Sequence, residues 1–237
     1  MSNDTGTQES ELTYENIVEH ILTMLRRVGA LPPDPVPTPW EAFLRLSDLI
    51  HETYEVPSTT FTPIMRRLLF ALGFAARPAN IVGVGTYVGY TFSWLLRYRS
   101  DPEAEPFFET AMGIDVDAQA NALARRNCAI LGHGERLTLV DADGVVAVTG
   151  SRQPIDLLYL DIDDPLTGKS AYWRVLEAAL PHLQSGALVL AHDPCVPNFE
   201  QDFAIYHHYI QKSGLFFGPW VFPVDACGLS IAVVQKA

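Results

Sequence analysis

The chain has 237 residues, of which 48% are hydrophobic and 11% aromatic, so it can build a real core and is not disordered throughout. Its formal net charge of −12 disfavours nucleic acid and anionic membranes as partners, because both require clustered Lys and Arg. Three widely spaced cysteines, no long apolar run and a polar N-terminus predict a cytoplasmic protein with free thiols and no membrane span.

The first 78 residues predict helices only. We expect residues 1–11 to be disordered, an amphipathic helix to follow at about 12–28, and further helices at about 40–54 and 63–76. Five prolines between Leu31 and Pro39 predict an extended linker between the first two helices. The chain is therefore expected to divide into a helical N-terminal domain, residues 1–78, and a second domain, residues 79–237.

After Pro78 the pattern alternates between strands and helices, which predicts a mostly parallel sheet covered on both faces. Strands are predicted at 81–84, 110–115, 136–140, 155–161, 187–192, 220–224 and 229–234, and helices at about 88–98, 117–131, 144–148, 169–183 and 198–213. Only residues 225–228 join the last two strands, so one of them must be antiparallel. The predicted fold is α/β and Rossmann-like, with seven strands.

A glycine-rich turn follows the first predicted strand. Gly83, Gly85 and Gly89 lie between that strand and a helix, an arrangement that brings backbone N–H groups and a helix N-terminus up to a polar small molecule. Only glycine allows both a close backbone approach and a positive φ without steric cost. The spacing differs from the G-x-G-x-x-G of dinucleotide sites, so the turn alone does not identify its ligand.

Acidic residues close the next four predicted strands, at the edge of the sheet where ligands bind. A carboxylate after the second strand suits a ribose diol, and Asp115 is the predicted ligand, while Asp117 is predicted to cap the following helix. The later strands end in Asp141-Ala142-Asp143, in Asp161 with Asp163 and Asp164, and in His192-Asp193.

These motifs, in this order and spacing, resemble those of class I S-adenosylmethionine (SAM)-dependent methyltransferases, and most of all the small-molecule O-methyltransferases of the catechol and caffeoyl-CoA type. The matching segments are Val82–Thr91, Gly113–Asp117, Asp156–Asp161 and Gly186–Asp193, and the resemblance covers about residues 56–237. It implies SAM as the cofactor, a small molecule as the acceptor, and an N-terminal helical lid over the acceptor pocket.

The resemblance also implies which residues hold the cofactor. The turn Gly85–Gly89 would lie under the methionine portion with Thr91 near its carboxylate, Asp115 on the ribose and residues 141–143 beside the adenine. Val56 and Thr60 would lie at the edge of the acceptor pocket. The implied cofactor-binding residues are Thr60, Gly83, Gly85, Thr86, Tyr87, Gly89, Tyr90, Thr91, Asp115, Val116, Asp141, Ala142, Asp143 and Asp161.

Two departures from the family pattern affect the expected chemistry. Metal-dependent members carry a lysine where this chain has Asp164 and an asparagine where it has Pro194, so a divalent metal is not expected. Were one bound, Asp161 and Asp193 would hold it together with waters. The family usually has an acidic residue where this chain has Gly83, and that carboxylate helps to hold the polar groups of the cofactor.

Methyl transfer to an oxygen also needs a base, and His192 is the candidate because its ordinary pKa lies near neutrality. A purely structural histidine is the alternative. Asp163 is a further candidate base or a helix cap. Tyr172 and Trp173 would either line the acceptor side or pack in the core, and Lys169 is interpreted as a solvated loop charge.

Gly83 leaves a second reaction open, in which SAM itself is cyclised to azetidine-2-carboxylate or 1-aminocyclopropane-1-carboxylate with release of methylthioadenosine. Without the acidic residue, the ammonium of SAM would be held less strongly and its pKa lowered. A ring of Tyr87, Tyr90, Tyr159 and Tyr172 could stabilise the sulfonium. A non-catalytic SAM-binding module is the third hypothesis, and a homodimer that exchanges lids would be compatible with the N-terminal helices.

Overall fold

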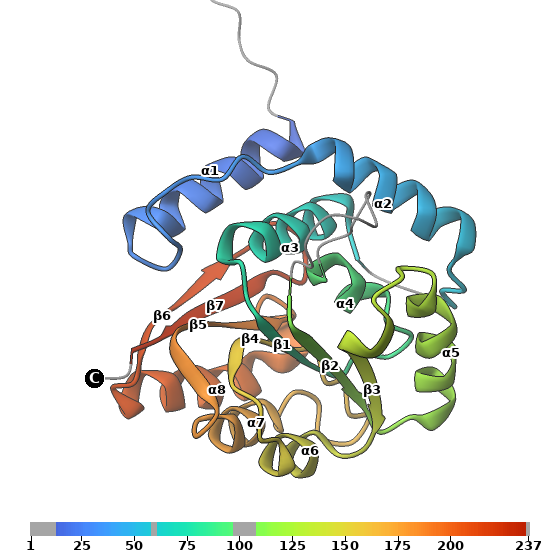
Figure 1. Cartoon of the computed structure of the whole chain (residues 1–237). Helices are drawn as coiled ribbons and strands as arrows, with labels where there is room; N and C mark the ends of the chain where they lie inside the picture. Colours follow the sequence, from blue (N-terminus) through green and yellow to red (C-terminus); the bar gives the residue numbers. More distant parts are fainter. Residues whose placement is uncertain (1–12, 58–60, 97–107, 236–237) are drawn as a thin grey trace, which may run out of the picture.

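The computed structural model describes residues 13–57, 61–96 and 108–235. In this part of the chain one seven-stranded sheet lies between two layers of helices (Figure 1). The strand order is β3-β2-β1-β4-β5-β7-β6. The strands are β1 (Asn80–Val84), β2 (Thr110–Asp115), β3 (Leu137–Asp141), β4 (Ile155–Leu160), β5 (Leu183–His192), β6 (Phe216–Phe222) and β7 (Leu229–Val234).

The predicted Rossmann-like fold and its antiparallel strand are confirmed. Strands β1 to β5 pair in parallel, whereas β7 runs antiparallel to both of its neighbours, β5 and β6. The chain order of the strands reverses between β1 and β4. In such sheets a crevice for ligands opens outside the carboxyl ends of the strands at this point, so the fold itself places the candidate site.

Eight α-helices are described, five on one side of the sheet, where α1 and α2 form an outer layer, and three on the other (Figure 1). Those of the first face are α1 (Tyr14–Arg27), α2 (Trp40–Thr53), α3 (Pro63–Ala76), α4 (Tyr90–Leu95) and α5 (Ala118–Ala129). Those of the second are α6 (Gly144–Gly150), α7 (Tyr172–Ala179) and α8 (Glu200–Ser213). Short 3₁₀ turns at Gly134–Arg136 and Pro197–Phe199 precede β3 and α8.

The N-terminal helices share one core with the sheet. Helix α3 lies against the sheet and is apolar on nearly all sides, because α1 and α2 cover its outer surface. Phe43 of α2 packs on Phe70 of α3 and on Trp94 of α4, with ring centroids 5.4 Å apart in both pairs. The outer helices are thus attached through α3 and α4 to the strands that carry the site.

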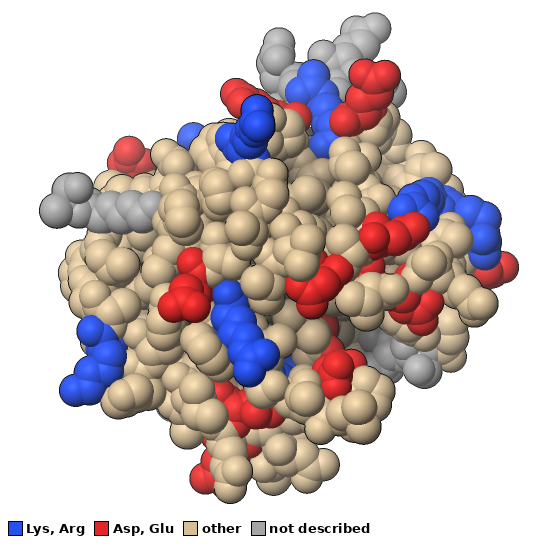
Figure 2. Space-filling model, turned by 90° about the horizontal axis from the view of Figure 1, so that it is seen from below, with Lys and Arg blue, Asp and Glu red and all other residues tan. Residues whose placement is uncertain are grey.

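The surface shows no gathering of basic side chains on the face seen in Figure 2, where Lys and Arg stand apart among acidic and uncharged residues. None of the described helices is both long and apolar enough to cross a membrane.

Candidate functional site

The glycine turn after β1 is held against the end of β4. Gly85 has φ +83°, and a Cβ there would overlap the carbonyl of Asp161 and lie 2.7 Å from the Ile162 nitrogen. Gly89 has φ +79°, and its Cβ would lie 2.7 Å from Cys128 Sγ on α5. Both positions need glycine, for the dihedral angle and for the close approach. The turn, β4 and α5 are therefore fixed relative to one another.

Asp115 lies at the end of β2, beside this turn. Its Oδ2 accepts the Tyr87 N–H at 2.7 Å and its Oδ1 accepts the Asp117 N–H at 2.9 Å. Each oxygen retains capacity for another hydrogen bond, as a ribose diol would require. Val116 is 73% exposed and Tyr87 46% exposed, so apolar surface lies open next to the carboxylate. The structure thus brings together an acceptor pair and a surface on which a flat ring could lie.

The end of β3 lies next to this position, and its carboxylates are already engaged. Asp141 pairs with Arg125 at 2.6 Å, and Asp143 caps α6 by accepting the Val146 N–H at 3.0 Å. The Ala142 N–H donates to the Asp115 carbonyl at 3.0 Å. Any contact of residues 141–143 with a ligand would therefore involve the backbone or the remaining lone pairs.

The cap predicted for the helix after β2 is present. Asp117 Oδ1 accepts the N–H groups of Gln119 and Ala120 at 2.8 and 3.0 Å, at the start of α5. This leaves Asp115 as the carboxylate of that strand end that faces the turn.

The space beside Gly83 is filled by an aromatic ring. A Cβ at this position would lie 2.7 Å from the buried ring of Phe92 and 2.9 Å from Thr86 Cγ2. An acidic side chain would not fit here without moving Phe92, which gives a packing reason for the departure from the family pattern. Thr86 itself is buried, and its Oγ1 has no hydrogen-bond partner among the described residues.

A buried charged cluster, formed by Asp161, Lys169, His192 and Asp193, lies at the ends of β4 and β5. Lys169 Nζ is 2.7 Å from Asp193 Oδ2 and 3.4 Å from Asp161 Oδ1. His192 Nδ1 is 3.1 Å from Asp193 Oδ1 and 3.3 Å from Asp161 Oδ1. The Lys169 side chain is only 1% exposed, so its interpretation as a solvated loop charge is wrong.

The loop after β4 explains why Lys169 points inward. Asp164 Oδ1 accepts the N–H groups of Leu166 and Thr167, each at 2.8 Å, which folds the loop back at Gly168 with φ +57°. Asp202 of α8 then accepts the Lys169 N–H at 2.9 Å. Helix α7 consequently begins at Tyr172, three residues later than predicted. The run of turn-forming residues from Asp163 to Gly168 is the signal that could have indicated this reversal.

The cluster shifts the pKa values of its members in favour of their charged forms. Burial alone would lower the pKa of His192, but the Asp161 and Asp193 carboxylates outweigh it and raise that pKa to about 10. Burial opposes the charged carboxylates, yet His192 and Lys169 hold the pKa values of Asp161 and Asp193 below their usual range. Burial likewise opposes the Lys169 ammonium, and the two carboxylates raise its pKa.

His192 presents one nitrogen to the cluster and one away from it. Its Nδ1 is held by the two carboxylates, while its Nε2 is buried with no partner among the described residues. The imidazole lies against Phe61, with ring centroids 4.7 Å apart. Such an arrangement keeps a proton on Nδ1, so Nε2 is the nitrogen that can exchange a proton with a ligand.

The residues present do not fit a divalent metal between Asp161 and Asp193. The Lys169 ammonium already contacts both carboxylates, and Asp193 uses its other oxygen for His192. The ligand atoms of His192, Asp193 and Cys227 lie within 4.8 Å of one another, but two of these three residues belong to the cluster.

The remaining candidate residues lie apart from one another. Tyr172 is fully buried on the α6–α8 face, with its hydroxyl donating to the His192 carbonyl at 3.3 Å. Tyr159 lies on the opposite face, with its hydroxyl donating to Asp161 Oδ2 at 2.9 Å. The proposed ring of four tyrosines is therefore wrong.

Asp163 is exposed, and Trp173 packs against Tyr209 of α8. Thr60 lies outside the described residues.

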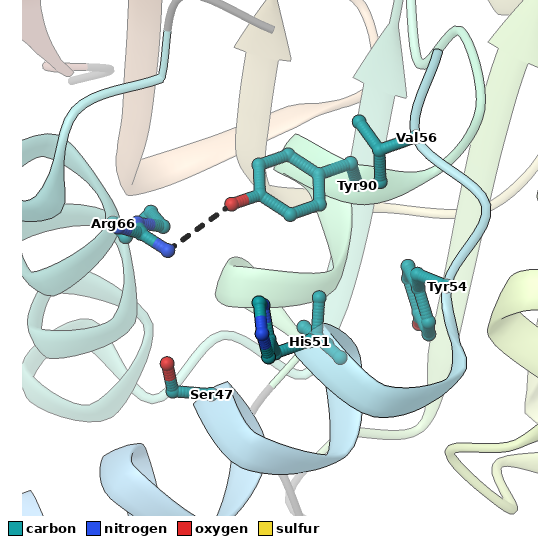
Figure 3. Close-up of a pocket in the computed structure, with 7 residues that line it drawn as sticks. Ser47, His51, Tyr54, Val56, Arg66 and Tyr90 are labelled. Atoms are coloured by element: carbon teal, nitrogen blue, oxygen red, sulfur yellow. Dashed lines mark hydrogen bonds between the residues drawn. The ribbon is translucent and has the colours of Figure 1, made fainter. Parts of the chain in front are cut away.

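A cavity of about 220 Å³ lies behind the first turn of α4, between α2 and α3 (Figure 3). Arg66 donates from Nη1 to the Tyr90 hydroxyl at 3.3 Å, and the two side chains point toward each other across it. The lining residues are Ser47, Ile50, His51, Tyr54, Val56, Arg66 and Tyr90. Thr91, the neighbour of Tyr90 on α4, is half-buried.

Asn127 of α5 connects one wall of this cavity to the glycine turn. Its side-chain amide exchanges two hydrogen bonds of 3.1 Å with the backbone of Glu55, next to Val56. The same amide donates to the Val88 carbonyl at 3.0 Å. Nothing in the sequence motifs pointed to Asn127 or to Arg66.

Comparison with known proteins agrees with this architecture. Residues 82–194 match the family model described as a methyltransferase domain. No curated protein sequence matches the chain.

Solved structures of methyltransferases share the fold along nearly the whole chain. An O-methyltransferase from Bacillus cereus, in complex with S-adenosylhomocysteine (SAH), superposes with a TM-score of 0.61 at 16% identity, over 92% of this chain and 100% of its own. The O-methyltransferase TomG from Streptomyces achromogenes, in complex with SAM, gives 0.60 at 17% identity, over 94% and 97%. SAH-bound PaMTH1 from Podospora anserina gives 0.56 at 16% identity, over 86% and 99%. Residues 82–194 are thus similar to a methyltransferase domain, and the chain shares the fold of these SAM- and SAH-binding methyltransferases.

Proposed function

We propose that the protein transfers the methyl group of SAM to a hydroxyl oxygen of a small molecule. Two parts of the site support this, the glycine turn with Asp115 and the histidine His192. The turn Gly85–Gly89, with Asp115 and the exposed Val116, offers backbone N–H groups, a diol acceptor and an apolar surface to an adenosine ligand. Two of the structural neighbours above hold SAH and one holds SAM in this fold.

The observation that supports methyl transfer is the environment of the His192 imidazole. Its Nδ1 is oriented by two carboxylates, and its buried Nε2, which has no partner among the described residues, can accept a proton whenever the ring is neutral. SAM, when bound, supplies an electrophilic methyl group on a positively charged sulfur. As the acceptor oxygen bonds to the methyl carbon and the carbon–sulfur bond breaks, His192 Nε2 takes the hydroxyl proton.

His192 must be neutral to act as this base. In the free protein the carboxylates raise its pKa to about 10, so the imidazole is charged at neutral pH. The positively charged sulfur of SAM, bound close to the ring, would favour the neutral form. The role of the cluster is then to orient the ring and to stabilise the imidazolium that forms as the proton is transferred.

The test is a product assay with a matched pair of variants. Purified protein is incubated with SAM and a panel of phenols and alcohols, and SAH is quantified by mass spectrometry. His192→Gln should lower SAH formation by about 10²–10⁴-fold, the usual contribution of a general base, without loss of SAH binding. His208→Gln alters an exposed histidine of α8 and should behave as wild type. Full activity of His192→Gln would refute the assignment.

The same assay tests the other two hypotheses considered from the sequence, cyclisation of SAM and a non-catalytic binding module. Enzyme-dependent release of methylthioadenosine from SAM alone would indicate cyclisation in place of methyl transfer. Binding of SAH without formation of either product would indicate a binding module.

A further inference from the structure

We infer that Lys169 takes the position that a divalent cation would occupy between Asp161 and Asp193, so that the protein works without a metal. Both carboxylates lie at neighbouring strand ends, β4 and β5, and both contact the Lys169 ammonium. The ammonium is held on its remaining sides by aromatic rings, 5.1 Å from the centroid of Phe199 and 5.6 Å from that of Tyr172.

The charge balance supports the replacement. Lys169 and a protonated His192 together carry two positive charges against the two carboxylates, as a single divalent ion would. A buried carboxylate pair without such compensation is strongly unfavourable, so some cation is required at this position. The loop that delivers Lys169 is itself anchored, through Asp164 within the loop and through Asp202 on α8.

The test is metal binding, measured apart from activity. Manganese is titrated into wild-type protein, Lys169→Ala and Lys169→Ala/Asp193→Asn, and free Mn²⁺ is followed by its EPR signal. Lys169→Ala should bind about one more ion than wild type, and the double variant should lose it again. Lys212→Ala, at an exposed lysine of α8, is the control and should match wild type.

The melting temperature gives a second readout that works even if Lys169→Ala is poorly folded. Added Mn²⁺ or Mg²⁺ should raise the Tm of Lys169→Ala and leave that of wild type unchanged. Wild-type activity should also be unaffected by EDTA. A wild-type Mn²⁺ site that Asp193→Asn removes would overturn the inference, as would a Lys169→Ala variant that gains neither binding nor stability from metal.

A second and independent observation concerns the cavity behind α4. We propose that Arg66 makes it a carboxylate-binding subsite. Arg66 is a half-buried cation, and its Nε is buried without a partner. Among the described residues no carboxylate lies within ion-pair distance of Arg66, in a chain with a net charge of −12. An arginine left unpaired beside a cavity matches a planar anion that can accept two of its N–H groups.

The other lining groups suit the same ligand. Ile50 and Val56 provide apolar walls, and Ser47 and His51 of α2 provide polar groups on the side opposite Tyr90 (Figure 3). The guanidinium also lies over the Trp94 ring, 5.8 Å from its centroid, which holds it in place. Tyr90 opens α4 directly after the glycine turn, so the cavity adjoins the proposed cofactor site, and this proposal rests on the proposed function in that respect.

The carboxylate could belong to the methionine arm of the cofactor or to the acceptor, and calorimetry separates the two. SAH carries the carboxylate, whereas methylthioadenosine has the same adenosine and thioether without it. If the cofactor is the source, Arg66→Gln should weaken SAH binding by at least about tenfold and leave methylthioadenosine unaffected, as expected for a lost charge-assisted pair. If the acceptor is the source, Arg66→Gln should leave SAH binding unchanged. It should then lower the affinity for 4-hydroxybenzoate, measured with SAH present, more than the affinity for phenol.

Arg45→Met, on the exposed side of α2, is the matched control and should leave all four affinities unchanged. Equal binding of SAH and of 4-hydroxybenzoate by wild type and Arg66→Gln would overturn the subsite. A wild-type protein that binds neither SAH nor methylthioadenosine would instead refute the proposed function, so the two failures are distinguishable.

Discussion

Gly85→Ala tests whether the glycine turn and the end of β4 are pressed together as described. Two costs add at this position. A non-glycine residue at φ +83° costs about 1–2 kcal/mol. The new methyl group would also overlap the Asp161 carbonyl, and overpacking a rigid neighbour costs a further ~1–3 kcal/mol. We therefore expect the free energy of unfolding to fall by about 2–5 kcal/mol, measured by urea denaturation.

Gly132→Ala separates the two costs. Gly132 has φ +70°, but a Cβ there would meet nothing within 4 Å, so this variant should lose only the dihedral contribution of about 1–2 kcal/mol. Gly85→Ala should in addition weaken SAH binding, because Asp161 and the turn would be pushed apart. Equal destabilisation by the two variants, or a fully stable Gly85→Ala, would refute the close approach.

Three further results are expected. Asp115→Ala should weaken SAH binding by about 1–3 kcal/mol in calorimetry through lost charge-assisted hydrogen bonds, and unchanged affinity would mean that the ribose lies elsewhere. Asp117→Ala, which removes only the cap of α5, should cost about 1 kcal/mol of stability in urea unfolding and leave SAH affinity unaltered. Because the folded-state pKa of His192 is raised from 6.5 to about 10, its stabilising contribution is complete below pH 6.5 and is lost as pH rises toward 10. Over this window the free energy of unfolding of the wild type should therefore fall more steeply with rising pH than that of His192→Gln, by up to about 1.4 kcal/mol per pH unit. Parallel curves for the two proteins would contradict the charged cluster.

Much of the fold could be predicted because its signals are local. The alternation of strand and helix gave the parallel sheet, and the short link at residues 225–228 required an antiparallel strand, as β7 shows. Helix α3 was predicted at about residues 63–76 and lies at Pro63–Ala76. The predicted ends of helices were wrong where contacts with residues far along the chain determine them. The start of α7 moved to Tyr172 because Asp202, far along the chain, holds the loop before it.

The candidate site was predictable only in part, for a related reason. Asp115 and His192 each end a strand and Asp161 directly follows one, so their common edge follows from the topology. Lys169 reaches that edge from a loop, and neither its spacing nor its charge distinguishes it from a solvated lysine. Arg66 carries no signal in the sequence either, because its position beside a cavity depends on how α2 and α3 pack.

The amide of Asn127 has a consequence for the order in which ligands bind. It holds both the cavity wall at Glu55 and the glycine turn at Val88, so neither segment can be ordered independently of the other. If the turn and the cavity bind the ligands proposed above, a ligand that stabilises the turn would reduce the entropy that a second ligand must lose to order the wall. By linkage the effect would be reciprocal, so the two proposed sites would bind their ligands cooperatively.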